Sequence, residues 1–94
     1  MKIIGVYIIQ SLKNGRYYVG STQDFESRIK YHNEGRVPST KHLRPWVLKV
    51  LLPCSSITLA KQSEFRLKKY KRRDILEKVI LDKTFPWEYN ASVV

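Results

Sequence analysis

Acidic residues, cysteines and long apolar runs are all scarce in this chain of 94 residues. The single cysteine, Cys54, cannot form an internal disulfide, and the two histidines do not stand at zinc-site spacing from it. The fold must therefore rest on packing. Apolar runs of a few residues exclude a membrane-spanning helix, which needs about 20 apolar residues. Because the first residues also lack a signal-peptide core, we expect a cytoplasmic protein.

The shortage of acids leaves a large positive charge. Eighteen Lys and Arg against eight Asp and Glu give a net charge of +10. A hydrophobic content of 43% separates the chain from a disordered basic tail, and its length fits one domain. The charge indicates a polyanionic partner, nucleic acid before anionic membrane, because no segment has the broad Leu, Phe or Trp face of a membrane-surface helix.

Apolar patterns, turn residues and caps predict the order β-β-α-β-α-α, a small sheet with helices against it and hence the α+β class. We expect strands at 2–10, 16–21 and 46–52, and helices at about 24–33, 57–70 and 73–83, the last a separate helix or a continuation. Either Ser21 or Asp24 caps the first helix, and Gly35 follows its end. The single domain spans 1–94, with a core at 1–83 and an aromatic segment at 84–94 that packs back.

Two tyrosines and two glycines stand out in the predicted hairpin. If the loop at Asn14-Gly15 pairs residues whose position numbers add to an odd number, Tyr7 and Tyr18 lie on the same face of the sheet. Gly5 and Gly20 flank them, and a glycine inside a strand often marks a close approach. Taken alone, the tyrosines fit ordinary sheet-packing aromatics.

The first predicted helix carries polar residues on its apolar stripe. Arg28 and His32 are four residues apart and share that stripe with Phe25 and Ile29, so they turn toward the sheet. The ordinary alternatives for Arg28 are an ion pair with Asp24 and a side chain that reaches past the apolar surface to water.

Glu64 is the single acid between Lys61 and Arg73, a stretch with seven basic residues, and it shares an apolar stripe with Ala60 and Leu67. A half-buried carboxylate must be paired or must hold a cation. The partner is either a nearby Lys or Arg or a divalent metal, and Mg²⁺ needs only one or two protein carboxylates. The basic stretch itself is either a solvated helix face or a phosphate-binding surface.

Four motifs in a fixed order resemble the GIY-YIG endonuclease superfamily: Gly5-Val6-Tyr7, Tyr18-Val19-Gly20, Arg28-x-x-x-His32 and Glu64 on a later helix. The resemblance covers nearly the whole chain. The chain looks like the small stand-alone bacterial members and is also similar to the nuclease domain of phage intron homing enzymes. The resemblance implies a three-stranded antiparallel sheet flanked by helices, and hydrolysis of a phosphodiester bond with Mg²⁺ or Mn²⁺.

The resemblance also implies a catalytic set, which consists of Tyr7, Tyr18, Arg28, His32, Glu64 and Asn90. In this set the tyrosines lie at the attacking water and the phosphate, Arg28 holds the phosphate, and Glu64 binds the metal. Family members often have an Asn about twelve residues after the Glu, where this chain has Leu76, so Asn90 is the candidate substitute. The general base is either Tyr7 or His32.

Flanking phosphates are expected to bind the basic loop and the basic stretch, through Arg36, Lys41, Arg44, Lys61, Lys68, Lys69, Lys71 and Arg72. The leading hypothesis is a DNA endonuclease, structure-specific or active in repair or recombination, with RNA left open as a substrate. The alternatives are a non-catalytic nucleic-acid-binding module and an accessory subunit that needs a protein partner. We expect a monomer or a weak dimer.

Overall fold

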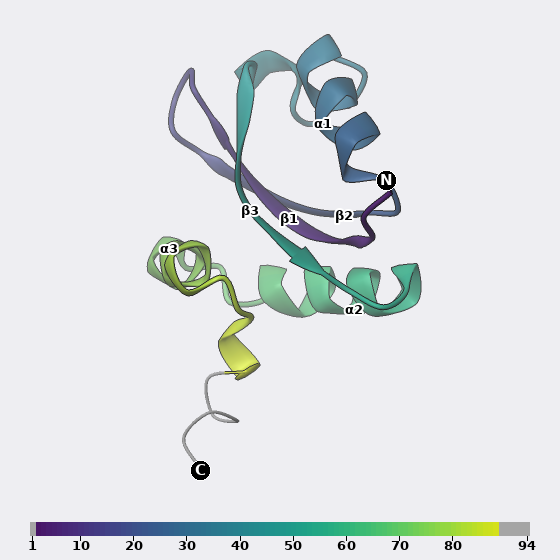
Figure 1. The fold of residues 1–94 in the computed structure, drawn as a ribbon. Helices are drawn as coiled ribbons and strands as arrows, with labels where there is room; N and C mark the ends of the chain where they lie inside the picture. Colours follow the sequence, from purple (N-terminus) through teal and green to yellow (C-terminus); the bar gives the residue numbers. More distant parts are fainter. Residues whose placement is uncertain (1, 89–94) are drawn as a thin grey trace.

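The computed structural model describes residues 2–88 (Figure 1). Along the chain the elements are β1 (Gly5–Ser11), β2 (Tyr17–Thr22), α1 (Phe25–Glu34), the 3-10 helix η1 (Lys41–Leu43), β3 (Trp46–Pro53), α2 (Ile57–Lys68) and α3 (Arg73–Asp82). The predicted α+β class and element order are confirmed. One detail differs: η1 lies inside the segment expected to be a loop. Of the two alternatives for residues 73–83, the structure has the separate helix, because α2 ends at Lys68.

The three strands form one antiparallel sheet in the order β2-β1-β3. The continuous apolar run of β1 follows from this central position, because β1 has a neighbour on each side and a packed layer on each face. In the β1–β2 register Tyr7 lies opposite Gly20, and Ile9 lies opposite Tyr18. Since directly opposite residues point to the same face, Tyr7 and Tyr18 share a face, as predicted.

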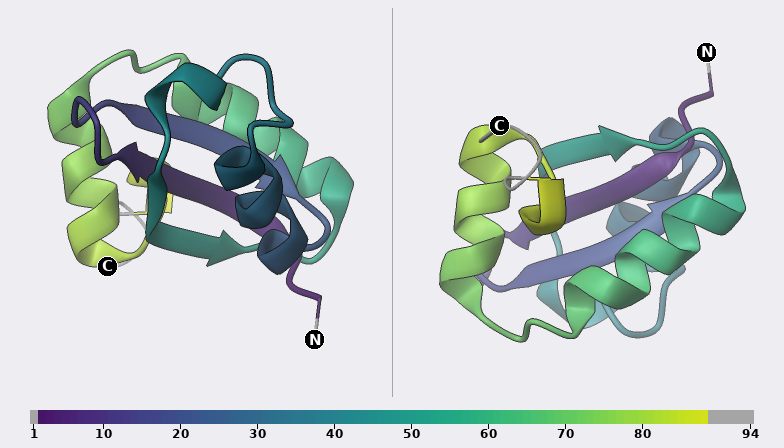
Figure 2. Two further views of the ribbon diagram at one scale, coloured as in Figure 1. Left: turned by 90° about the horizontal axis from the view of Figure 1, so that it is seen from above. Right: turned by 90° about the horizontal axis from the view of Figure 1, so that it is seen from below.

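Helices cover both faces of the sheet (Figure 2). On one face α1 packs over a cluster that contains Tyr7, Ile9 and Trp46. On the other face α2 lies along β2 and α3 crosses the strand ends, over a cluster that includes Val6 and Ile8. Within residues 2–88 no helix combines the length and the apolar character that crossing a membrane would require.

The start of the C-terminal aromatic segment packs on the second of these clusters. Phe85 is buried there, and its ring stacks on Trp87 with centroids 4.6 Å apart. The remainder of that segment, including Asn90, lies outside the described residues.

The ends of α1 are set by its caps. The Asp24 carboxylate accepts from the backbone N–H of Ser27, so Asp24 is the N-cap. Gly35, with φ 80°, adopts the left-handed conformation that closes the helix. The alternative cap, Ser21, is part of β2.

Candidate active site

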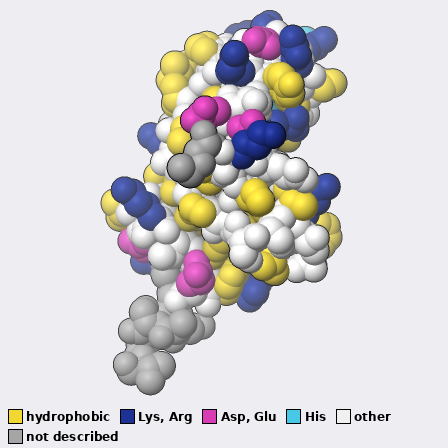
Figure 3. All heavy atoms as spheres, turned by 45° about the vertical axis from the view of Figure 1, so that its right-hand side comes forward, with side chains coloured by type: hydrophobic (Ala, Val, Ile, Leu, Met, Phe, Trp, Pro, Cys, Tyr) yellow, Lys and Arg dark blue, Asp and Glu magenta, His cyan; other side chains and the backbone are white. Residues whose placement is uncertain are grey.

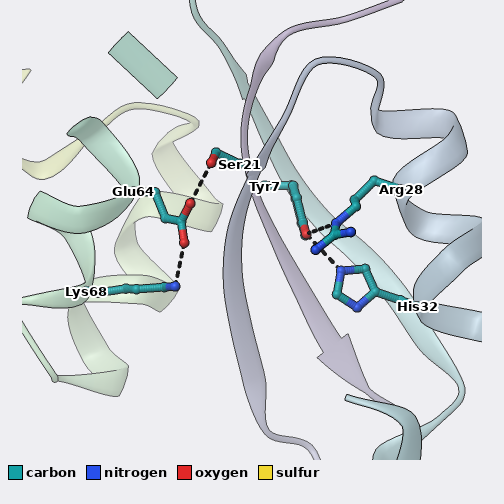
Figure 4. A network of polar contacts seen from close by, with 6 residues as sticks. All are labelled: Tyr7, Ser21, Arg28, His32, Glu64 and Lys68. Carbon is teal, nitrogen blue, oxygen red and sulfur yellow. Dashed lines mark hydrogen bonds and ion pairs between the residues drawn. The ribbon is translucent and has the colours of Figure 1, made fainter. Parts of the chain in front are cut away.

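The Tyr7 hydroxyl is the centre of a buried hydrogen-bond network between the sheet and α1 (Figure 4). Its oxygen lies 2.8 Å from Nε2 of His32 and accepts a hydrogen bond of 3.3 Å from Nε of Arg28. The phenol reaches this point by crossing Gly20, where a Cβ atom would overlap the hydroxyl and the ring. Gly20 is therefore needed for the close approach of Tyr7 to β2.

A second set of contacts fixes the state of His32, which is fully buried. Its Nδ1 lies 2.8 Å from the Thr40 hydroxyl, which donates to the backbone oxygen of Val37 at 3.3 Å. Because the Thr40 proton is directed to Val37, the Thr40 oxygen accepts from Nδ1–H of His32. Nε2 of His32 then carries the lone pair that accepts the Tyr7 proton.

Burial shifts the pKa of both partners toward their neutral forms. It raises the pKa of the Tyr7 phenol from 10.0 to about 12, against the opposing effect of the hydrogen-bonded Arg28. It lowers the pKa of His32 from 6.5 to about 4, and the nearby charge of Arg28 acts in the same direction. The hydrogen bond to Tyr7 raises the pKa of Arg28. At neutral pH the site therefore contains a neutral phenol, a neutral imidazole and a guanidinium cation.

Tyr18 packs beside this network from β2. Its ring centroid lies 5.1 Å from that of His32 and 6.4 Å from that of Tyr7, and its other neighbour is Trp46 at 6.2 Å. The ammonium group of Lys68 lies 5.7 Å from the Tyr18 ring centroid. Tyr18 thus lies between the network around Tyr7 and the cationic end of α2.

Glu64 on α2 forms a second cluster, separated from Tyr7 by the edge strand β2 (Figure 4). One carboxylate oxygen accepts from the Ser21 hydroxyl at 2.5 Å, and the other forms an ion pair with Lys68 one helical turn away. Lys68 is thus the basic partner of Glu64. Lys68 connects the clusters, because it contacts both Glu64 and Tyr18.

Glu64 is the residue with the chemistry to hold a divalent cation. Residues 2–88 contain no group of three or more His, Cys, Asp and Glu side chains arranged as a metal cage. Mg²⁺ often binds one or two carboxylates and completes its shell with water and substrate phosphate. The Glu64 side chain is 20% exposed and has the Ser21 hydroxyl beside it, which fits this open type of site. Lys68 would have to release one carboxylate oxygen.

The alternative that Arg28 forms an ion pair with Asp24 is wrong. Asp24 uses its carboxylate on the backbone and side chain of Ser27 as the cap of α1, while Arg28 donates to Tyr7. None of the ion pairs formed within residues 2–88 contains Arg28.

The predicted phosphate-binding cations fall into two groups. Lys61, Lys68, Lys69, Lys71 and Arg72 lie on α2 and just after it, and Arg36, Lys41 and Arg44 lie on the segment around η1. Figure 3 shows Lys and Arg side chains spread over the face in view rather than gathered at one place. Lys68 is the member that reaches the candidate site.

Two hydroxyl groups of the site, those of Ser21 and Thr40, were not predicted from the sequence as functional. Ser21 follows the Tyr18-Val19-Gly20 triplet directly and could have been noticed as a strand residue on the face opposite Tyr18. Thr40 lies in an irregular segment eight residues after His32, where no periodic pattern indicates its direction.

Comparison with known proteins finds one family model. The sequence model of the GIY-YIG catalytic domain matches residues 3–90, which is nearly the whole chain. Comparisons with curated proteins and with solved structures found no significant match.

Proposed function

The chain belongs to the GIY-YIG family, a family of nucleases, and on that premise we propose that it is an endonuclease that hydrolyses phosphodiester bonds in DNA with a divalent cation. The observation that carries the proposal is the Tyr7 hydroxyl, held between a guanidinium and an unprotonated imidazole nitrogen. This arrangement can take a proton from an attacking water and pass one on.

The proton path runs from water to the Tyr7 oxygen and from the Tyr7 oxygen to Nε2 of His32. With a pKa of about 12, Tyr7 is not a phenolate at neutral pH and needs an acceptor behind it. His32 is neutral and accepts at Nε2, while the Thr40 oxygen keeps the proton on Nδ1. Tyr7 and His32, the two candidate bases, therefore act in series in this proposal.

Arg28 supplies the phosphate contact. Its Nε donates to Tyr7 and the guanidinium also interacts with the Tyr18 side chain, and its remaining N–H groups donate to phosphate oxygens. Glu64, with Ser21 beside it, would hold the cation, which when bound neutralises charge on the phosphate and on the leaving oxygen. The net charge of +10 favours a polyanionic substrate.

Cleavage of plasmid and flapped DNA, with Mg²⁺ or with EDTA, tests the proposal. The wild type should cut in Mg²⁺ alone, and Glu64→Ala and Arg28→Ala should each be slower by roughly 10²–10³-fold, because each removes charge stabilisation of the transition state. Glu26→Gln is the matched control, since Glu26 is exposed on α1, and it should cut at the wild-type rate.

Two results would contradict the proposal. One is a wild-type protein that binds DNA but fails to cut it in every divalent metal tested. The chain would then be a non-catalytic binding module. The other is a folded Glu64→Ala protein that cuts as fast as the wild type. An RNA of the same sequence, run in parallel, identifies the nucleic acid that the enzyme prefers.

A further inference from the structure

A hollow of about 410 Å³ opens between β2 and the junction of α2 with α3. Residues 16–19 form one wall, and residues from 67 to 76 form the other. We call this space the junction hollow. Its volume lies in the range of small-ligand sites, about 300–1,000 Å³. Tyr18 and Lys68 line it and also belong to the candidate active site, so the two spaces adjoin.

The interior of the junction hollow is apolar and aromatic. Val19 and Leu67, both buried in the core, line it together with Leu76. Tyr17 and Tyr18 also line it from β2, and the guanidinium of Arg73 lies 4.4 Å from the Tyr17 ring centroid. A planar nucleobase suits such a lining, because its faces are apolar and their burial needs no sequence-specific hydrogen bond.

Cations surround this interior. Arg16, Lys68, Lys71, Arg72 and Arg73 all line the junction hollow, and no acidic residue is among the lining residues. Arg72 and Arg73 pair with acids of α3, at 2.7 and 3.6 Å. Within residues 2–88 Arg16 and Lys71 form no ion pair and are open to an anionic ligand.

Lys71 is held at the junction hollow in an unfavourable backbone conformation. Its φ is 51°, and Lys83 is the other described non-glycine residue with a positive φ, at 58°. Glycine adopts this region at lower cost, so a lysine there gives up stability. Lys83 ends α3 and does not line the junction hollow. The two lysines are thus alike in charge and backbone and differ in location.

We propose that the junction hollow binds an unpaired nucleotide next to the phosphate that is cleaved. The base enters against Val19, Leu67 and Leu76, beside Tyr17 and Tyr18, and its phosphate lies against Arg16 and Lys71. A base inside a continuous duplex stays stacked on its neighbours, and unstacking it costs free energy. The enzyme should therefore prefer DNA with a single-stranded flap. This inference rests on the proposed function for the position of the cleaved phosphate.

Binding without cleavage provides the test. Fluorescence anisotropy in EDTA compares a labelled duplex that carries a short flap with the same duplex without the flap, at one salt concentration. The wild type should bind the flapped DNA about 10-fold more tightly. Lys71→Gly should lose at least 5-fold of this preference, and Lys83→Gly should keep it. Thermal denaturation should find both variants at least as stable as the wild type, since each relieves the same backbone strain.

The inference is overturned if flapped and plain duplex bind equally, or if Lys83→Gly loses the preference as fully as Lys71→Gly. Cleavage in Mg²⁺ separates this outcome from failure of the proposed function. A protein that cuts DNA without flap preference retains its function and loses this inference. A protein with a Lys71-dependent flap preference that never cuts loses the proposed function and retains the binding site.

Discussion

Thr40 acts on the site through His32 without a contact to Tyr7. It accepts from Nδ1–H, and its own hydroxyl proton is directed to Val37. The indole N–H of Trp46 donates to the Thr40 backbone oxygen at 2.9 Å and holds the segment in place. Thr40 is a positioning residue, because it sets which imidazole nitrogen faces the tyrosine.

Thr40→Val should reduce kcat by at least 10-fold and leave KM nearly unchanged. The substitution keeps the shape of the side chain but leaves Nδ1–H without a buried acceptor, which also costs about 1–3 kcal/mol of stability. Thr40→Ser should restore kcat, because it returns the hydroxyl. Steady-state kinetics across pH measure the effect. A valine variant with wild-type kcat and an unchanged pH profile would show that Thr40 does not position His32.

His32 should make stability depend on pH in a defined window. Its folded pKa of about 4 lies below the ordinary value of 6.5, so the unfolded chain binds the proton more readily. The contribution is fully present above pH 6.5 and is lost as the pH falls toward 4, by about 3 kcal/mol at most. Urea unfolding between pH 4 and 7 should find this slope reduced in His32→Gln. His42→Gln, which changes an exposed histidine, should keep it.

At the scale of elements, the contacts of β1 with its two neighbouring strands explain the glycines at positions 5 and 20. A Cβ on Gly5 would lie 2.5 Å from the backbone oxygen of Leu52 on β3, whereas a Cβ on Gly20 of β2 would meet the movable end of the Tyr7 side chain. The first contact is with the backbone of a neighbouring strand, and the second is with a side chain of the candidate active site. The same kind of substitution should therefore have different effects at the two positions.

Gly20→Ala should fold, because the Tyr7 ring can shift, but it should lose at least 10-fold in cleavage rate as the hydroxyl leaves its place between Arg28 and His32. Gly5→Ala should instead lower the melting temperature strongly, because backbone must move. Thermal denaturation and cleavage assays on both variants separate the effects. A Gly20→Ala protein with wild-type activity would mean that the close approach is not needed.

The elements were predictable where short-range physics decides them. The apolar run of β1, the cap at Asp24 and the left-handed Gly35 each follow from local chemistry, and the shared face of Tyr7 and Tyr18 follows from strand parity. The junction of α2 with α3 could not be predicted in this way, because nothing in the sequence indicates that Lys71 adopts a positive φ.

The site was predictable in its residue types and not in its partners. The stripe on α1 placed Arg28 and His32 toward the sheet, but the choice between Asp24 and Tyr7 as partner of Arg28 depends on how α1 sits on the sheet. The pairing of Glu64 with Ser21 likewise depends on the packing of α2 along β2, across 43 residues of sequence.

For the whole molecule, the dispersed charge should make DNA affinity strongly dependent on salt. The logarithm of the binding constant for duplex DNA should fall linearly with the logarithm of salt concentration. Lys61→Gln, which changes an exposed lysine of α2, should lower the magnitude of the slope by about 0.9 if that lysine contacts one phosphate. Lys83→Gln serves as the equal-charge control and should leave the slope unchanged. Equal slopes for the wild type, Lys61→Gln and Lys83→Gln would show that Lys61 does not contact the DNA.

The central position of β1 divides the chain into parts that differ in their freedom to change. Six of its seven residues are buried, and the strand carries both the core contacts of Val6 and Ile8 and the Tyr7 hydroxyl at the centre of the candidate active site. A substitution on either face of β1 is therefore judged by selection for folding and for chemistry together. Substitutions at exposed residues of α2 and α3 affect binding and have less effect on the packing of the sheet. Evolution, or an engineer who seeks a new substrate preference, has room on those helices and almost none on β1.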